Sequence, residues 1–168
     1  CGGGGRLVVD KCNSCGGQGK TPKKRTLTVK VPPGIHDGQA IRIPGEGEPG
    51  ERGGPPGDLH VVIRIHDHEL FDRDHDNLVL KMPVSFTQAA LGSEVDVPTL
   101  NGSEKLTIPK GTQHGEAFRL RHKGLPNLRE HYHGDLIVVV HVEVPKKLSE
   151  RQEELLRAFA ELEHRDVL

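Results

Sequence analysis

Hydrophobic residues alternate with polar ones in two stretches of the chain, and this alternation predicts two β-strands. In residues 59–66 every second side chain is apolar, and residues 136–143 repeat the pattern with Leu136, Val138, Val140 and Val142. A period of two places alternate side chains on opposite faces, so each strand has one buried face and one wetter face. Shorter strands are predicted over residues 27–31, 40–43, 105–108 and 117–120.

The two stretches belong to an internal repeat. Residues 31–66 align without gaps onto residues 108–143 at an offset of 77, and thirteen of these thirty-six positions are identical. The matches include Pro32/Pro109, Gly34/Gly111, Gly38/Gly115, Ala40/Ala117, Arg42/Arg119, Gly47/Gly124 and the triplet 57–59 against 134–136. Two similar β-rich domains in tandem are the simplest explanation of such a repeat.

The second copy also has a leading portion. Strands are predicted over residues 78–82 and 94–97, with Asn101-Gly102 as a hairpin turn. Between these strands, residues 85–88 form a capping box and Gly92 stops a short helix that covers the sheet. At the same offset, the cysteine segment falls where the second copy has its hairpin turn. We therefore expect a zinc module inserted into that hairpin of the first copy, whose own leading strands lie upstream of residue 1.

A helix is predicted at the end of the chain, because residues 149–152 form a second capping box. Its apolar residues fall on one face at helical spacing: Leu155, Leu156, Phe159 and Leu162. Packing of this face against the second domain is favoured, and pairing with a partner chain is the alternative, since a helix this short seldom holds a dimer by itself.

Composition excludes several classes of protein. No apolar run approaches the length of about 20 residues that a membrane-spanning helix needs, and no secretory signal is visible. A formal net charge of −1 and five aromatic residues argue against a nucleic-acid surface. The basic run Lys20–Arg25 is interpreted as a solvated linker. Three cysteines fit a reducing compartment better than a disulfide framework, so the cytoplasm is the expected location.

The cysteines suggest a metal. Cys12 and Cys15 are separated by two residues and followed by glycines, the spacing of a zinc knuckle. The same spacing serves thiol redox chemistry, but that use normally sits at a helix start, which Gly16, Gly17 and Gly19 oppose. Zinc is therefore favoured over a dithiol oxidoreductase. A closed structural zinc site needs four ligands, and with Cys1 the chain supplies three cysteines.

Other chemistry is sparse. No nucleophile elbow, zinc-protease motif or P-loop occurs, so the chain is predicted not to be an enzyme. The histidine pairs 66/68 and 131/133 lack further ligands, and we interpret them as loop and strand-face residues. Phe71 stands alone among charged residues, and core packing is its default role. The alternative is a groove lined by Leu27 and Phe71 that takes an extended apolar peptide as an added strand.

With these features placed, the chain resembles the carboxy-terminal part of DnaJ, the zinc-containing class of J-domain co-chaperones. The resemblance covers essentially the whole chain. It is carried by Cys12-x-x-Cys15-x-Gly17-x-Gly19, Val31-Pro32-Pro33-Gly34, Gly45-Glu46-Gly47-Glu48, Gly57-Asp58-Leu59, the segment 68–77, Ala89-Ala90-Leu91-Gly92, the segment 97–102 and Gly134-Asp135-Leu136.

The resemblance implies an all-β fold with minor α structure. Two tandem β-sandwich-like peptide-binding domains are expected, with the remnant of an inserted Cys-rich zinc knuckle before them and a short C-terminal helix after them. The corresponding boundaries are residues 1–22 for the partial zinc-finger region, 23–70 for the remainder of client-binding domain I, 71–146 for domain II and 147–168 for the helix.

The resemblance also implies roles for single residues. Cys12 and Cys15 match the fourth zinc repeat and Cys1 the third, which bind different zinc ions, so the site is incomplete in this chain and filled in the longer parent. Leu27 and Phe71 match positions that line the client groove, although the strand to which a client adds lies upstream of the zinc module.

The expected function is that of a co-chaperone that binds unfolded or misfolded client proteins and delivers them to a DnaK-type heat-shock ATPase. No His-Pro-Asp tripeptide occurs, so this piece is not expected to stimulate that ATPase. A homodimer stays open, because the chain stops at Leu168 near the family's dimerisation segment. The alternatives are a thiol-disulfide oxidoreductase using Cys12 and Cys15 and a metal-dependent interaction scaffold.

Overall fold

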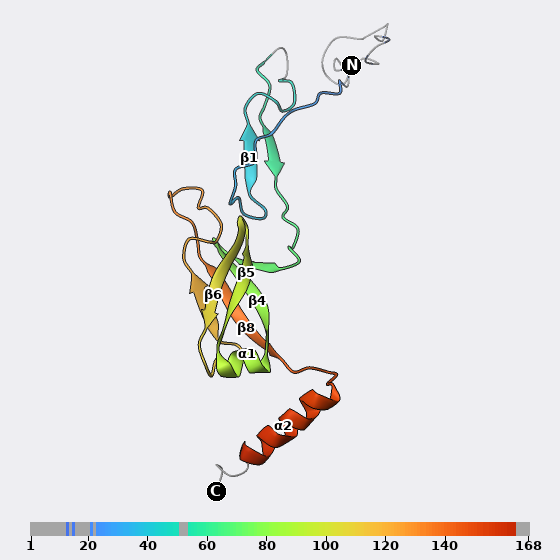
Figure 1. Ribbon diagram of the computed structural model, residues 1–168. Coiled ribbons are helices and arrows are strands. Elements are labelled where there is room, and N and C mark those ends of the chain that lie inside the picture. The colour runs from blue at the N-terminus through green and yellow to red at the C-terminus, as the bar shows by residue number, and fades with distance from the viewer. Residues whose placement is uncertain (1–12, 14, 16–20, 22, 51–53, 164–168) are drawn as a thin grey trace. The chain divides into compact units, whose positions relative to one another are not determined.

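The fold is that of a computed structural model, which describes residues 13, 15, 21, 23–50 and 54–163 (Figure 1). The chain divides into two units, Cys1–Lys30 and Val31–Leu168. Within the described residues, every helix and strand belongs to the second unit. The elements are β1 (Ala40–Ile43), β2 (Leu59–Val62), β3 (Phe71–Asp74), β4 (Asn77–Ser85), α1 (Phe86–Leu91), β5 (Ser93–Thr99), β6 (Gly102–Ile108), β7 (Ala117–Leu120), β8 (Leu136–Glu143) and α2 (Glu150–Glu163).

The strands form three sheets. A four-stranded sheet has the order β3-β4-β8-β7, and two-stranded sheets are made by β1 with β2 and by β5 with β6. All neighbouring strands are antiparallel except β4 and β8, which run parallel from Leu78 opposite Leu136 to Ser85 opposite Glu143. The expected fold class is confirmed: the chain is mainly β, with two short helices.

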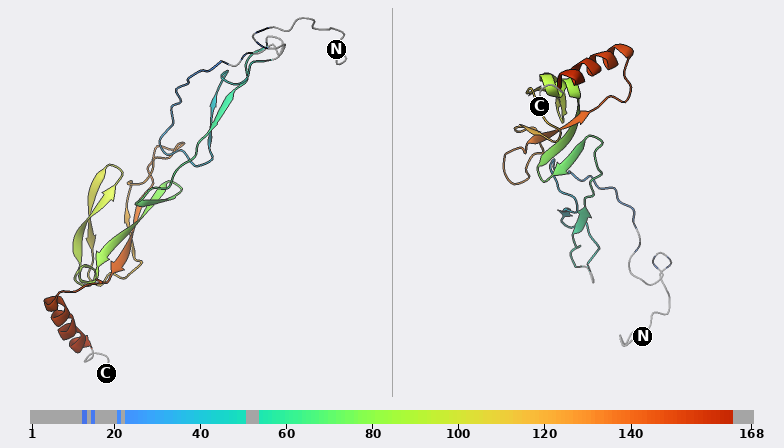
Figure 2. Two further views of the ribbon diagram at one scale, coloured as in Figure 1. Left: turned by 90° about the vertical axis from the view of Figure 1, so that its right-hand side faces the viewer. Right: turned by 90° about the horizontal axis from the view of Figure 1, so that it is seen from below.

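The β5–β6 hairpin and the four-stranded sheet make two layers around one core (Figure 2). Val97 of β5 and Leu106 of β6 pack in one cluster with the sheet residues Leu80, Leu136 and Val138. Because these strands alternate in burial, their apolar side chains all reach the space between the layers. The α1 helix closes one end of the sandwich with Ala89, which packs on Val84, Ile108 and Val140.

The α1 helix forms where the capping box predicts it. Ser85 caps it by accepting from the N–H of Gln88, and the Gln88 side chain accepts from the N–H of Ser85. Gly92 ends the helix at φ +77°, a region that favours glycine. The second capping box, Ser149 with Gln152, is likewise present at the start of α2.

The internal repeat is also a structural repeat. Ile41 lies opposite Val61 in the β1–β2 pair, and Phe118 lies opposite Val138 in the β7–β8 pair, so both pairs have one register at the offset of 77. Hydrogen bonds outside the ladders recur as well. The N–H of Gly47 donates to the carbonyl of Gly57 at 2.8 Å. In the second copy, the N–H of Gly124 donates to the carbonyl of Gly134 at the same distance. The two copies therefore share backbone geometry as well as sequence.

Ion pairs repeat in the same way. Arg42 pairs with Asp58 at 2.5 Å in the first copy, and Arg119 pairs with Asp135 at 3.7 Å in the second. The same aspartates accept backbone N–H bonds, Asp58 from Gly45 and Asp135 from His122. Each aspartate thus ties the loop after the first strand of its copy to the start of the second.

Some expected elements differ. Residues 27–31 form no strand, because a strand requires a ladder partner and the described residues supply none for this segment. The strand expected over 59–66 ends at Val62, near the point where its partner β1 begins. The hairpin loop is Leu100-Asn101, one residue earlier than expected, since Gly102 already pairs with Thr99.

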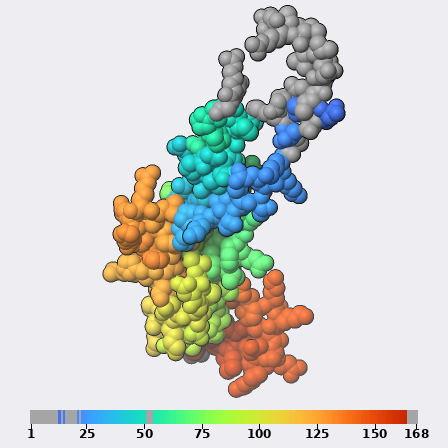
Figure 3. Space-filling model, turned by 90° about the horizontal axis from the view of Figure 1, so that it is seen from above, coloured from blue at the N-terminus to red at the C-terminus, as the bar shows by residue number. Residues whose placement is uncertain are grey.

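The favoured packing of the last helix against the second domain is present only as a ring contact that buries no residue of the helix. No residue of α2 is buried, and its four large apolar residues are 36–59% exposed. The atoms of α2, coloured red, lie at the surface in Figure 3. The contact is between the rings of Phe159 and Phe86 of α1, whose centroids lie 6.2 Å apart. None of the helices in the described residues is long and apolar enough to cross a membrane.

Candidate functional site

The two residues expected to line a peptide groove have different surroundings. Phe71 is the first residue of β3, only 7% exposed, and belongs to the core cluster around Leu80 and Leu136. Its ring also lies 5.1 Å from that of His68. Leu27 is half-buried and lies in the other unit. The default expectation for Phe71, core packing, therefore holds.

A more open apolar surface lies on the β1–β2 sheet. Leu136, Val138 and Val140 of the second repeat are at most 1% exposed beneath the β5–β6 hairpin. Their counterparts in the first repeat, Leu59, Val61 and Ile63, are only half-buried. Among the described residues, the first repeat thus has half-buried apolar side chains at positions that the β5–β6 hairpin covers in the second.

One edge of β2 has no strand partner among the described residues. In the second repeat, β8 has neighbours on both sides, β4 and β7. Within the described part of the chain, β2 pairs only with β1. Beside this edge, Val62 is 60% and Ile65 is 42% exposed. An unpaired edge next to apolar side chains is the arrangement to which an extended peptide adds as a further strand.

The described residues do not form a metal centre by themselves. Cys1 and Cys12 lie outside the described residues, and Cys15 is half-buried. In the part of the chain that the structure describes, no three His, Cys, Asp or Glu side chains come together as metal ligands. Neither of the histidine pairs 66/68 and 131/133 is part of such a group.

A polar cluster that sequence reasoning missed lies where the two repeats meet. Asp76, in the turn between β3 and β4, is 9% exposed. Its Oδ2 accepts from Asn127 Nδ2 at 2.6 Å and from the Tyr132 hydroxyl at 3.1 Å. The hydrogen bond from Asn127 lowers the pKa of Asp76 below its ordinary value; burial opposes this, while Tyr132, His36 and Arg73 add to it. In turn, the bond to Asp76 raises the pKa of Tyr132.

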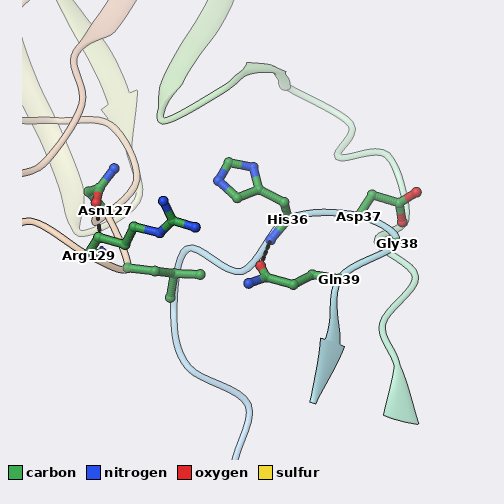
Figure 4. Close-up of a pocket in the computed structure, with 7 residues that line it drawn as sticks. His36, Asp37, Gly38, Gln39, Asn127 and Arg129 are labelled. Atoms are coloured by element: carbon green, nitrogen blue, oxygen red, sulfur yellow. Dashed lines mark hydrogen bonds between the residues drawn. The ribbon is translucent and has the colours of Figure 1, made fainter. Parts of the chain in front are cut away.

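A pocket of about 560 Å³ adjoins this cluster (Figure 4). It is lined from the first repeat by residues 36–39 and from the second by residues 127–129. Gln39 accepts from the N–H of His36, and Asn127 Oδ1 accepts from the N–H of Arg129, so both walls are held by local bonds. The sequence signal for this cluster is the segment 68–77, which contains Arg73 and Asp76 beside the more conspicuous Phe71.

Comparison with known proteins agrees with this architecture. The family model of the DnaJ C terminal domain matches residues 8–145. Relatives include proteins named chaperone protein DnaJ from Halalkalibacterium halodurans, 52% identical over 96% of this chain, and from Bacillus cytotoxicus, 51% identical over 95%. A third, from Parageobacillus thermoglucosidasius, is 49% identical over 92%.

The chain spans less than half of each relative, 44%, 44% and 41% of their lengths. The match nevertheless includes both copies of the repeat, the β5–β6 hairpin and the paired cysteines. With a family model over most of its length and relatives at about half identity, the chain belongs to the DnaJ C-terminal domain family.

Proposed function

We propose that this chain is the client-binding part of a DnaJ-type co-chaperone, which holds unfolded or misfolded polypeptides in an extended form and passes them to a DnaK-type heat-shock ATPase in the cytoplasm. The observation that carries the proposal is the match of the DnaJ C terminal domain model over residues 8–145, which includes both copies of the repeat. Among the described residues, the β1–β2 sheet has half-buried apolar side chains that suit an extended apolar peptide.

The chemistry of this surface suits a sequence-tolerant binder. Main-chain hydrogen bonds to a strand edge are available to any extended peptide, and alternate apolar side chains would add hydrophobic contact. Unfolded proteins expose such segments, whereas folded ones bury them. Leu27 and Phe71 stay proposed client contacts; the burial of Phe71 favours a supporting role from beneath the surface.

The full-length parent is proposed to bind zinc through Cys12 and Cys15 in one site and Cys1 in another. A homodimer is proposed as well. The exposed apolar face of α2, Leu155, Leu156, Phe159 and Leu162, supports it, because a surface helix usually buries such a stripe.

Fluorescence anisotropy with a labelled peptide of alternating leucine and threonine tests client binding. Val62→Asp places a charge on an exposed side chain beside the edge of β2 that has no partner among the described residues, so we expect affinity to fall at least tenfold. Leu91→Asp is the matched control, because Leu91 is 69% exposed at the end of α1, away from that edge. No binding by the full-length parent, or equal losses in the two variants, would contradict the proposal.

A further inference from the structure

The two repeats meet at a close approach of backbone. Gly34, at φ +87° in the first repeat, faces the loop that follows β7 in the second. A Cβ atom at this position would lie 2.0 Å from the carbonyl oxygen of Pro126, so only glycine fits. The next residue, Ile35, is 7% exposed. The turn 34–36 is thus seated firmly against the second repeat.

Arg73 of β3 holds this turn. Its Nη1 donates to the carbonyl of Ile35 at 2.6 Å, and its Nη2 donates to that of Gly34 at 2.8 Å. Its Nε donates to the carbonyl of His75 at 2.7 Å, which fixes the guanidinium in its own turn. A forked guanidinium engaged by three backbone carbonyls is a rigid clamp, and a lysine could not reproduce its geometry.

The clamp also orients a histidine. Arg73 Nη2 lies 3.1 Å from His36 Nδ1, and because a guanidinium can only donate, Nδ1 accepts. In the neutral ring the proton is therefore on Nε2, which lies 3.7 Å from Asp76 Oδ1. This oxygen is buried and has no hydrogen-bond partner among the described residues. His36 is thus aimed at the one oxygen of Asp76 that Asn127 and Tyr132 leave open.

The repeat itself supplies a comparison. The counterpart of His36 in the second copy is Gln113, and both donate their N–H to a side-chain oxygen three residues on, of Gln39 and of Glu116. The side chain of Gln113 instead turns back to the carbonyl of Gly111. The backbone at His36 thus makes the same hydrogen bond as its counterpart in the second copy. The His36 side chain differs from its counterpart, because it lies next to Arg73 and Asp76.

We propose that the seam formed by residues 34–36, Arg73 and Asp76 is a latch that fixes the orientation of the first repeat on the second, so that the two repeats act as one rigid body. Each repeat has its own pair of hydrogen-bonded strands and its own Arg–Asp ion pair. The contacts at the seam therefore determine how one repeat is oriented on the other. The latch is independent of the proposed client binding, and its test uses no peptide.

Hydrogen exchange in the full chain measures the coupling directly. Arg73→Met removes every donor of the clamp at similar length, so the amides of β1 and β2 are expected to exchange at least tenfold faster, while those of β4 and β8 are unchanged. Arg119→Met is the control, because Arg119 is an exposed arginine paired with Asp135 inside the second repeat. The Arg119→Met variant should leave the exchange rates of the β1 and β2 amides unchanged.

Faster exchange in all four strands of the Arg73→Met variant would mean general loss of stability and would overturn the latch, as would no change in any of them. His36→Gln installs the residue that the second repeat uses and spares the clamp donors. A smaller increase confined to β1 and β2 is expected; if it matches the wild type, His36 has no part in the latch.

Discussion

At the scale of single residues, the repeat lets one copy serve as a reference for the other. Gly45 in the first copy has φ +71°, and its counterpart in the second copy is His122 at φ +59°. Left-handed backbone costs a residue with a side chain about 1–2 kcal/mol, whereas glycine adopts it freely. The second copy thus carries strain at a position where the first has none.

We therefore expect His122→Gly to stabilise the fold by about 1 kcal/mol. The hydrogen bond from the N–H of residue 122 to Asp135 survives this change, because it comes from the backbone. Urea denaturation measures the effect, and Gly45→His should show the opposite sign. A destabilised His122→Gly variant would mean that the imidazole itself contributes a contact.

Asp76 gives the fold a dependence on acid pH. Its pKa is lower in the folded chain than its ordinary value of 3.8. Its contribution to stability is therefore complete above that value and is lost as the pH falls through the folded pKa. We expect Asp76→Asn to lower stability at pH 7 and to flatten its decline below about pH 4. The urea midpoints of the wild type and the variant are measured across this pH range. If both midpoints fall by the same amount as the pH is lowered, Asp76 does not cause the pH dependence.

At the scale of elements, the sequence predicted what local chemistry decides. The α1 helix begins at its capping box and ends at Gly92, and β1 and β7 have the expected bounds. The register of the two copies followed from the gapless repeat. Pairing between distant strands could not be predicted in this way. Residues 27–31 have strand composition but find no ladder partner in the part of the chain that the structure describes, and no local pattern indicated that β4 is the parallel neighbour of β8.

The candidate site was less predictable for the same reason. Phe71 was conspicuous as a lone aromatic residue, yet its burial depends on Leu80 and Leu136, which only the tertiary fold brings near. Arg73 and Asp76 matter through partners more than thirty residues away, such as Gly34 and Asn127. No periodicity or spacing in the sequence encodes such contacts.

Equivalent strand positions in the two repeats should contribute differently to the free energy of unfolding. Leu136 is fully buried in the sandwich, whereas its counterpart Leu59 is only half-buried. Leu136→Ala is therefore expected to cost about 2–5 kcal/mol of unfolding free energy, and Leu59→Ala less than half as much. Urea denaturation of the two variants compares them, and equal losses would mean that the first repeat has a core as closed as the second.

At the scale of the whole molecule, the two copies of the repeat share one strand register. The second copy is covered by the β5–β6 hairpin and flanked by β4, whereas the described residues hold no counterpart of these strands for the first copy. The apolar side chains of the β1–β2 sheet are the surface proposed for client binding. The latch at Arg73 would then decide how that surface is presented.

The parallel pairing of β4 with β8 also bears on how the chain reaches this state. Asn77 and Asp135, which bond where the pairing begins, are 58 residues apart. Closing so long a loop must precede any gain from the contact, so non-local pairings form slowly. During synthesis the hairpin β5–β6 can form early, but its apolar face has no finished sheet to cover until β8 emerges. The sandwich core can therefore close only once β8 has been made.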